Sequence, residues 1–246
     1  MTDAAFLKPG ATDVVPLSDE EAVSQVLVLA VENLWEAVNE LTRLRRTHKE
    51  YYLVTIFGSA RIQPGTDHYE RVKKLAFQLT SMGCGIITGG GPGLMQAANE
   101  GASLTGHDAV QRSIGIRVDL PFEKDPNPFV GKTYEHKTFF SRLHHFMIMS
   151  DAFIVVPGGI GTMLELSMVW QLLQVRKLYD TPLILVGSMW QELVDWAVKH
   201  MTKGDIELAK PVDFEIPICV KHSQDAIEIV RAHRAKWLKA HGRVDT

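Results

Sequence analysis

The stretch Asp151-Ala-Phe-Ile-Val-Val-Pro-Gly-Gly-Ile-Gly-Thr-Met-Leu-Glu165 has the pattern of a buried strand, a glycine turn and the start of a helix. Residues 152–156 form an apolar run of strand length, typical of a strand covered on both faces of a parallel sheet. The glycines after Pro157 let an anion approach the main chain closely. Thr162 adds a hydroxyl and a backbone N–H at a helix N-terminus, where unpaired N–H groups favour phosphate. Because helical side chains lean toward the N-terminus, we expect the Glu165 carboxylate beside that phosphate.

Two earlier junctions between a strand and a glycine turn follow the same pattern. Predicted strand 53–57 leads into Gly58-Ser59-Ala60-Arg61, and predicted strand 85–88 leads into Gly89-Gly90-Gly91-Pro92-Gly93-Leu94-Met95. Ligands of parallel sheets bind beyond the carboxyl ends of the strands, so we expect the three junctions to meet at one pocket. The candidates for phosphate or nucleotide binding are Ser59, Gly89, Gly90, Gly91, Gly93, Gly158, Gly159, Gly161 and Thr162.

Apolar runs and helical periodicity alternate along the rest of the chain. This alternation predicts an α/β protein with a Rossmann-like doubly wound parallel sheet, in which helices cover both faces in three α/β/α layers. We expect a single such domain over residues 51–246, with a long loop at 119–137. The further predicted strands are 113–118, 182–186 and 216–220, and the predicted helices include 69–82, 94–101, 138–149, 166–178, 189–201 and 224–241.

The N-terminal segment has a different composition. Residues 1–17 are rich in Ala, Thr, Pro and Asp without periodicity, and we expect a disordered tail there. Residues 18–50 are predicted to hold an amphipathic helix that begins with a capping box at Ser18 and Glu21. Its apolar stripe fits either the edge of the sheet or a second subunit, and we expect a homo-oligomer, either a dimer or a hexamer.

Composition excludes several classes of partner. A formal net charge of −3 and a pI of about 6.4 give no general attraction to nucleic acid or to anionic membranes. No apolar run approaches the roughly 18 residues that a membrane helix needs. The two cysteines, Cys84 and Cys219, lack metal-ligand spacing and are predicted to be buried thiols, so we expect a cytoplasmic protein with no metal site.

The glycine turns do not complete the common nucleotide-binding fingerprints. The pairs Gly89-x-Gly91 and Gly159-x-Gly161 lack the third glycine of a dinucleotide site, because Leu94 and Leu164 stand in its place. No complete Gly-x-x-x-x-Gly-Lys-Ser/Thr phosphate loop occurs in the sequence, because Gly131-Lys132-Thr133 has Pro126 where the first glycine is required. One such turn alone is explained by packing, but three at one edge of a sheet favour a mononucleotide or a sugar phosphate.

The two longer glycine motifs, together with Arg142 upstream of the second, resemble the Lonely Guy family of nucleoside 5′-monophosphate phosphoribohydrolases. The resemblance covers about residues 53–201, and members of this family have often been labelled lysine decarboxylases. It implies hydrolysis of AMP or of a cytokinin riboside 5′-monophosphate to the free base and ribose 5-phosphate, without a cofactor. It also implies that Arg142 and Glu165 are catalytic and that the glycine motifs bind the phosphate.

The sequence departs from the compact members of the family in two places. Arg142 lies in the run Phe139-Phe140-Ser141-Arg142-Leu143, whereas compact members have Met-His-x-Arg-Lys. The extra N-terminal segment and a helix after the matched region resemble the longer bacterial branch. Met95 and His145 are candidates for the wall of a base pocket, although a core methionine and a structural histidine are the alternatives.

Two other functions remain open at this point, a ligand carrier and an assembly module built on the apolar stripe of residues 27–41, whereas lysine decarboxylation is rejected. A carrier of a nucleotide-like ligand is the main alternative, because the related molybdenum cofactor carrier proteins resemble this fold and glycine pattern. Lysine decarboxylation needs a lysine that forms a Schiff base with pyridoxal phosphate, and neither glycine motif contains a lysine.

Overall fold

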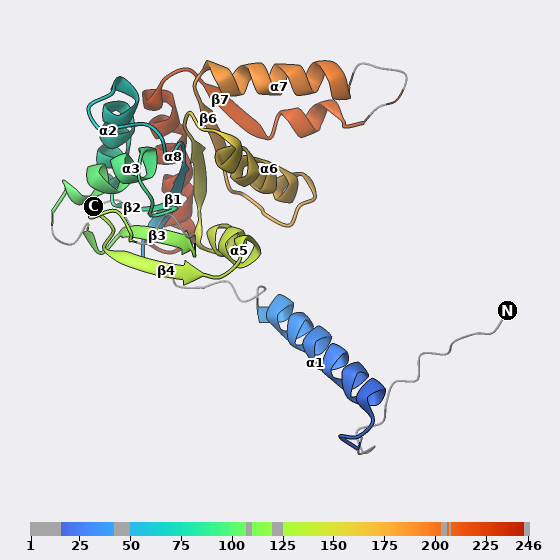
Figure 1. Ribbon diagram of the computed structural model, residues 1–246. Coiled ribbons are helices and arrows are strands. Elements are labelled where there is room, and N and C mark those ends of the chain that lie inside the picture. The colour runs from blue at the N-terminus through green and yellow to red at the C-terminus, as the bar shows by residue number, and fades with distance from the viewer. Residues whose placement is uncertain are drawn as a thin grey trace. The chain divides into compact units, whose positions relative to one another are not determined.

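The computed structural model describes residues 16–41, 50–106, 110–119, 125–202, 206 and 208–243. The chain divides into two units, Met1–Thr47 and His48–Thr246. In the first unit, helix α1 spans Glu20–Leu41 (Figure 1). Asp19 caps it, because the backbone N–H of Ala22 donates to Asp19 Oδ1 at 3.1 Å, so the predicted capping box at Ser18 and Glu21 is wrong. The predicted tail over residues 1–15 and helix over 42–49 lie outside the described residues.

The second unit is built on one parallel sheet, as the sequence predicts. In the part of the chain that the structure describes, the sheet has seven strands in the order β4-β3-β2-β1-β5-β6-β7 (Figure 1). The strands are β1 Tyr52–Phe57, β2 Cys84–Thr88, β3 Ser113–Val118, β4 Lys132–His136, β5 Ala152–Val155, β6 Leu183–Val186 and β7 Pro217–Val220. Every pairing between neighbours is parallel. The order reverses between β1 and β5, which is where doubly wound sheets bind ligands.

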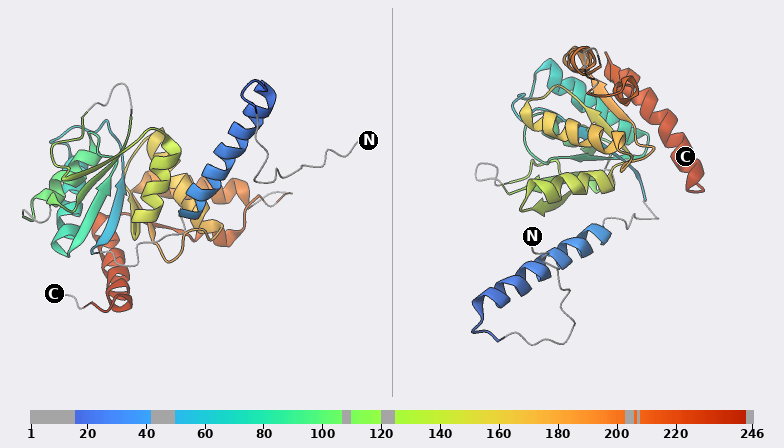
Figure 2. Two further views of the ribbon diagram at one scale, coloured as in Figure 1. Left: turned by 90° about the horizontal axis from the view of Figure 1, so that it is seen from below. Right: turned by 90° about the vertical axis from the view of Figure 1, so that its right-hand side faces the viewer.

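Helices cover both faces of the sheet and confirm the three-layer prediction (Figures 1 and 2). One face packs against α2, α3 and α8, which span Asp67–Ser81, Leu94–Ser103 and Ser223–Ala240. The other face packs against α5, α6 and α7, which span Phe139–Met149, Ile160–Gln174 and Ser188–Met201. A short 3₁₀ helix, η1, spans Pro211–Phe214. Alternate residues of β1 enter the two cores, with Val54 and Ile56 on one side and Phe57 on the other.

The predicted loop over residues 119–137 is wrong at its end, because β4 lies there. Its sequence, Lys-Thr-Tyr-Glu-His, lacks the apolar run that marks the interior strands, and most of its side chains are exposed or half-buried. Among the described strands, β4 pairs only with β3, at the edge of the sheet. An edge strand is buried on fewer sides than an interior strand, so its residues need not be apolar.

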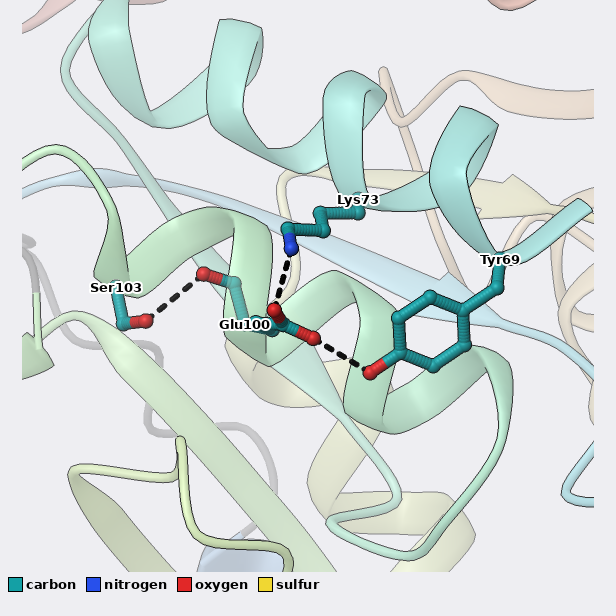
Figure 3. A network of polar contacts seen from close by, with 4 residues as sticks. All are labelled: Tyr69, Lys73, Glu100 and Ser103. Atoms are coloured by element: carbon teal, nitrogen blue, oxygen red, sulfur yellow. Dashed lines mark hydrogen bonds and ion pairs between the residues drawn. The ribbon is translucent and has the colours of Figure 1, made fainter. Parts of the chain in front are cut away.

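A half-buried polar cluster fixes α2 against α3. Figure 3 shows the Glu100 carboxylate between Tyr69 and Lys73, both on α2. The Tyr69 hydroxyl donates to Glu100 Oε2 at 2.6 Å, the Lys73 ammonium donates to Oε1, and Ser103 Oγ donates to the Glu100 carbonyl at 2.8 Å. Burial raises the Glu100 pKa, but the bonds from Lys73 and Tyr69 outweigh it and leave that pKa below its usual value. The cluster therefore holds the helix that follows the Gly89–Gly93 turn.

We expect Gly101→Ala to destabilise the protein by about 3 kcal/mol, because overpacking that forces backbone apart costs this much. The two helices touch at Gly101, where an added Cβ would overlap the carbonyl of Lys73. Chemical denaturation measures the change. Ser103→Ala on the same helix is the control and should cost no more than about 1 kcal/mol, since it removes one hydrogen bond. Equal stability of the two variants would contradict close packing at Gly101.

Candidate functional site

The three predicted glycine junctions meet at the carboxyl edge of the sheet. The Ser59 N–H, after β1, donates to the Pro157 carbonyl, after β5, at 3.1 Å. The Leu94 N–H, at the start of α3, donates to the Ser59 carbonyl at 2.8 Å. Gly93 has a φ of +71°, and an added Cβ there would overlap the backbone of Ser59 and Ala60, so only glycine fits. Backbone hydrogen bonds thus join the turn after β1 to the other two.

Arg142 and Glu165 form an ion pair beside these turns. Arg142 Nη2 lies 3.6 Å from Glu165 Oε1, and the two side chains are 13% and 12% exposed. Arg142 projects from α5, where its Nε donates to the Ile116 carbonyl of β3 at 3.0 Å and its guanidinium lies 5.5 Å from the Phe146 ring centre. Gly89 lies against both Arg142 and Met95, since an added Cβ would overlap the guanidinium and the thioether. The glycine turn after β2 therefore adjoins the ion pair.

Burial, opposed by Arg142, brings the pKa of the Glu165 carboxyl close to neutrality. Burial raises the pKa of Glu165 to about 7, while the Arg142 guanidinium acts in the opposite direction. A carboxyl with this pKa exists in both protonation states at physiological pH, as acid–base groups of enzymes often do. Among the described carboxyl groups, Glu165 has the pKa that burial raises most clearly toward neutrality. Its carboxyl also faces the Arg142 guanidinium.

The turn after β5 presents backbone at the start of α6. Gly159 is the N-cap and receives no side-chain cap, and Gly159 and Gly161 are exposed with open space around them. Thr162 is only 4% exposed, and its side chain packs against Gly158. The backbone N–H groups at the helix start are therefore more accessible to an anion than the packed Thr162 hydroxyl is.

The Ser59 hydroxyl forms a hydrogen bond within its own turn. Its Oγ accepts from the Arg61 N–H at 3.1 Å, and the residue is half-buried. The side chain of Ser59 therefore orders the loop after β1, while its backbone links the other two glycine turns.

A buried polar network behind the Gly89–Gly93 turn was not predicted. Thr88 Oγ1 donates to Asn99 Oδ1 at 2.7 Å and accepts from the Gly90 N–H at 2.9 Å. Asn127 donates from Nδ2 to the Gly91 carbonyl and to Asn99 Oδ1, at 3.0 Å each, and from its backbone to the Gly90 carbonyl at 2.9 Å. These hydrogen bonds fix the backbone of the turn at Gly90 and Gly91. The available signal was an asparagine within the otherwise apolar face of a helix, which is costly to bury without partners.

The two base-pocket candidates lie in different surroundings. Met95 borders Gly89 next to the ion pair. His145 Nδ1 lies 2.8 Å from His136 Nε2, and its ring packs on Tyr134 of the edge strand β4. Burial, then the charges of Arg142 and His144, lower the His136 pKa. The structure therefore places Met95 at the ion pair and His145 against β4, so their joint role remains a prediction.

A metal site and a membrane-spanning helix are both absent from the described residues. Among residues 16–41, 50–106, 110–119, 125–202, 206 and 208–243, no group of three His, Cys, Asp or Glu side chains is arranged to hold a metal. Within the same residues, no helix combines the length and the apolar composition that a membrane span requires.

Comparisons with known proteins identify a family and similar chains. A family model described as possible lysine decarboxylase matches residues 95–230. A pyrimidine/purine nucleotide 5′-monophosphate nucleosidase of Escherichia coli K12 is 31% identical over 128 residues, which cover 49% of this chain and 28% of that protein. A cytokinin riboside 5′-monophosphate phosphoribohydrolase of Arabidopsis thaliana is 26% identical over 168 residues, which cover 65% of this chain and 75% of that protein.

Solved structures share the fold. The molybdenum cofactor binding protein of Rippkaea orientalis superposes with a TM-score of 0.55 at 17% identity, over 75% of this chain and 98% of that chain. The molybdenum cofactor carrier protein of Chlamydomonas reinhardtii gives a TM-score of 0.56 at 17% identity, over 76% and 99%. At this identity the likeness establishes the architecture alone.

Proposed function

This chain belongs to the family described as possible lysine decarboxylase, and we propose that it hydrolyses the N-glycosidic bond of nucleoside 5′-monophosphates. The products would be a free base and ribose 5-phosphate. AMP and cytokinin riboside 5′-monophosphates are the proposed substrates. The names of the Escherichia coli and Arabidopsis thaliana relatives support this reaction class.

The observation that carries the proposal is the buried Arg142–Glu165 ion pair at the edge where the glycine turns meet. N-glycosidic cleavage builds positive charge on the sugar and negative charge on the departing base. A carboxylate and a guanidinium held side by side can stabilise both charges without rearranging. The exposed helix start at Gly159 is the proposed place for the 5′-phosphate, which would fix the sugar between them.

In the proposed mechanism, ionised Glu165 orients a water molecule and stabilises the oxocarbenium-like sugar. The water oxygen forms a bond to C1′ as the bond from C1′ to the base nitrogen breaks, and the bonding electrons leave with the base. The water gives up one proton to solvent as it adds to C1′, and the departing base takes up one proton from solvent, so the overall reaction consumes one water molecule. Arg142 stabilises the developing negative charge and holds Glu165, but it does not supply the proton because guanidinium groups stay protonated in proteins.

The decarboxylase description is not supported by the residues of the site. That chemistry requires a lysine to carry pyridoxal phosphate, and both glycine motifs lack lysine. The ionisable groups that face each other at the glycine turns are instead an arginine and a glutamate. We therefore base the proposed function on Arg142 and Glu165 and not on the decarboxylase description.

The proposal is tested with the purified protein, AMP, GMP, CMP, UMP and isopentenyladenosine monophosphate, by chromatography of the free bases. We expect adenine or isopentenyladenine to be released without added metal. If every nucleotide returned intact while one of them bound tightly, the alternative function as a nucleotide-like carrier would replace hydrolysis. If none bound or reacted, both proposals would fail.

We expect kcat/KM for AMP to rise roughly tenfold between pH 6 and pH 8, because the ionised fraction of a group with a pKa of about 7 grows by that factor. Burial raises the Glu165 pKa, so the active carboxylate forms only as the pH passes through neutrality. The measurement is a pH–rate profile in buffers of constant ionic strength. A flat profile over this interval would show that Glu165 ionisation is not required.

We also propose a cytoplasmic homo-oligomer, a dimer or a hexamer. Large apolar side chains on α5 and α6 support association, since Phe140 is 78% exposed and Ile160 is 88% exposed. Sedimentation velocity measures the assembly, and a monomer at micromolar concentration would contradict it.

A further inference from the structure

A second cleft opens at the carboxyl edge of β5, β6 and β7, on the other side of Pro157 from the glycine turns. It has a volume of about 960 Å³, and its lining includes Pro157 but neither Arg142 nor Glu165. The residues that end β6 and β7, Val186 and Val220, line it as well. The cleft is therefore a separate feature of the same sheet edge, and the proposed hydrolysis does not use it.

The lining of this cleft combines an apolar floor with a cationic rim. Val72 and Leu75 of α2 are buried and line it together with the strand ends. Arg71 and Lys74, on the exposed side of α2, and Lys221, after β7, add three positive charges. Clefts of about 300 to 1,000 Å³ with apolar walls and few polar groups are typical of small-molecule sites. An anion with an apolar portion fits this lining.

The charge at the cleft is opposite to that of the whole chain. Glu192 is the acidic residue among the described residues of the lining, so it and the three cations give a local charge of +2, while the whole chain carries −3. Arg71 lies 3.9 Å from Asp67, but both side chains are mostly exposed, and such pairs are weak and easily replaced. The positive charge is therefore local to this part of the surface.

Two helices also begin at the cleft. Ser188 and Met189 start α7 after Gly187, which has a φ of +112° and provides no side-chain cap. Ser223 and Gln224, in the first turn of α8, line the cleft from the other side. The uncapped N–H groups at the start of α7 favour negative charge, in addition to the three cationic side chains, whereas at the start of α8 the Asp225 carboxylate already accepts from the His222 N–H at 3.3 Å.

We propose that this cleft is a second ligand site that binds an organic phosphate of the nucleotide class without cleaving it. The cationic rim and the start of α7 bind the phosphate groups, and the apolar floor packs against the base. The lining offers no arginine–glutamate ion pair like that of Arg142 and Glu165 among its described residues, so the ligand remains intact. This inference does not depend on the proposed hydrolysis.

Calorimetric titration of the full-length protein with ADP tests the proposal. Lys221→Glu and Lys74→Glu, on two different elements of the rim, should each weaken ADP binding at least about tenfold, because each replaces an attractive charge by a repulsive one. Lys199→Glu, an exposed position on α7 outside the lining, is the matched control and should bind ADP like the wild type. Arg142→Ala should also retain ADP binding, and Lys221→Glu should release base from AMP at the wild-type rate.

Three results would overturn the proposal. These are the absence of ADP binding to the wild type at millimolar concentration, unchanged binding in both rim variants, and loss of binding in Arg142→Ala in place of the rim variants. Circular dichroism melting of each variant separates loss of binding from unfolding. Failure of the hydrolytic function appears separately, as intact nucleotides in the chromatographic assay, because ADP binding requires no turnover.

Discussion

Glu165→Gln is expected to lower the rate of base release from AMP at least about 1,000-fold, since charge stabilisation in a water-poor site is commonly worth this much. Glutamine keeps the size and the hydrogen-bonding geometry of the side chain but removes the negative charge that faces Arg142 at 3.6 Å. The measurement is single-turnover release of adenine followed by chromatography. Glu215→Gln, at an exposed position after η1, is the control and should retain the full rate.

The same substitution should not unfold the protein. Burial raises the Glu165 pKa from 4.5 to about 7, so the folded state holds this proton more tightly than the unfolded chain does. The wild type therefore loses stability as the pH rises from about 4.5 to 7, and Glu165→Gln should be the more stable protein at pH 8, by up to about 3 kcal/mol. Near pH 4 the two should be equal. An inactive variant that melts lower than the wild type at pH 8 would attribute the lost activity to misfolding.

Gly89→Ala is expected to lower kcat about 100-fold, because misplacing a catalytic group by about 1 Å costs this much. The added Cβ would overlap the Arg142 guanidinium and the Met95 thioether, which are the ends of flexible side chains and can move aside. The protein should therefore fold while its ion pair is displaced. Steady-state kinetics with AMP and a melting curve measure both effects.

Ser103→Ala, at the other end of α3, is the control for that experiment and should leave kcat unchanged. Retention of kcat in Gly89→Ala would mean that Arg142 can move without consequence, which would contradict a role for the pair in the reaction. A variant that fails to fold would instead indicate that the turn cannot yield at Gly89.

The sequence predicted the elements whose signal lies within a few residues. The apolar run before Pro157 and the glycine turns gave the interior strands, their parallel arrangement and their common edge. β4 was missed because Lys132–His136 is polar and paired on one side only. The helix predicted to reach Leu178 ends at Gln174, where Arg176 takes a φ of +57° that no glycine signals.

The candidate site was predictable only in part, since its geometry depends on residues distant in the chain. Arg142 and Glu165 were chosen for a resemblance, and their 3.6 Å separation follows from the packing of α5 beside α6. The support of the Gly89–Gly93 turn by Asn127 joins residues 36 positions apart. The partner of His145 lies on the edge strand that the sequence did not reveal. Local patterns cannot specify such pairings.

The close packing of α2 on α3 has a thermodynamic consequence. One surface of α2 is joined to α3 by the Glu100 cluster in Figure 3, and α3 begins at the Gly89–Gly93 turn. Another surface of α2 carries the Arg71 and Lys74 side chains of the second cleft. A ligand that shifted α2 would displace the turn with it, and linkage then requires reciprocity. If a ligand in the second cleft changed the affinity for substrate by some factor, bound substrate would change the affinity for that ligand by the same factor.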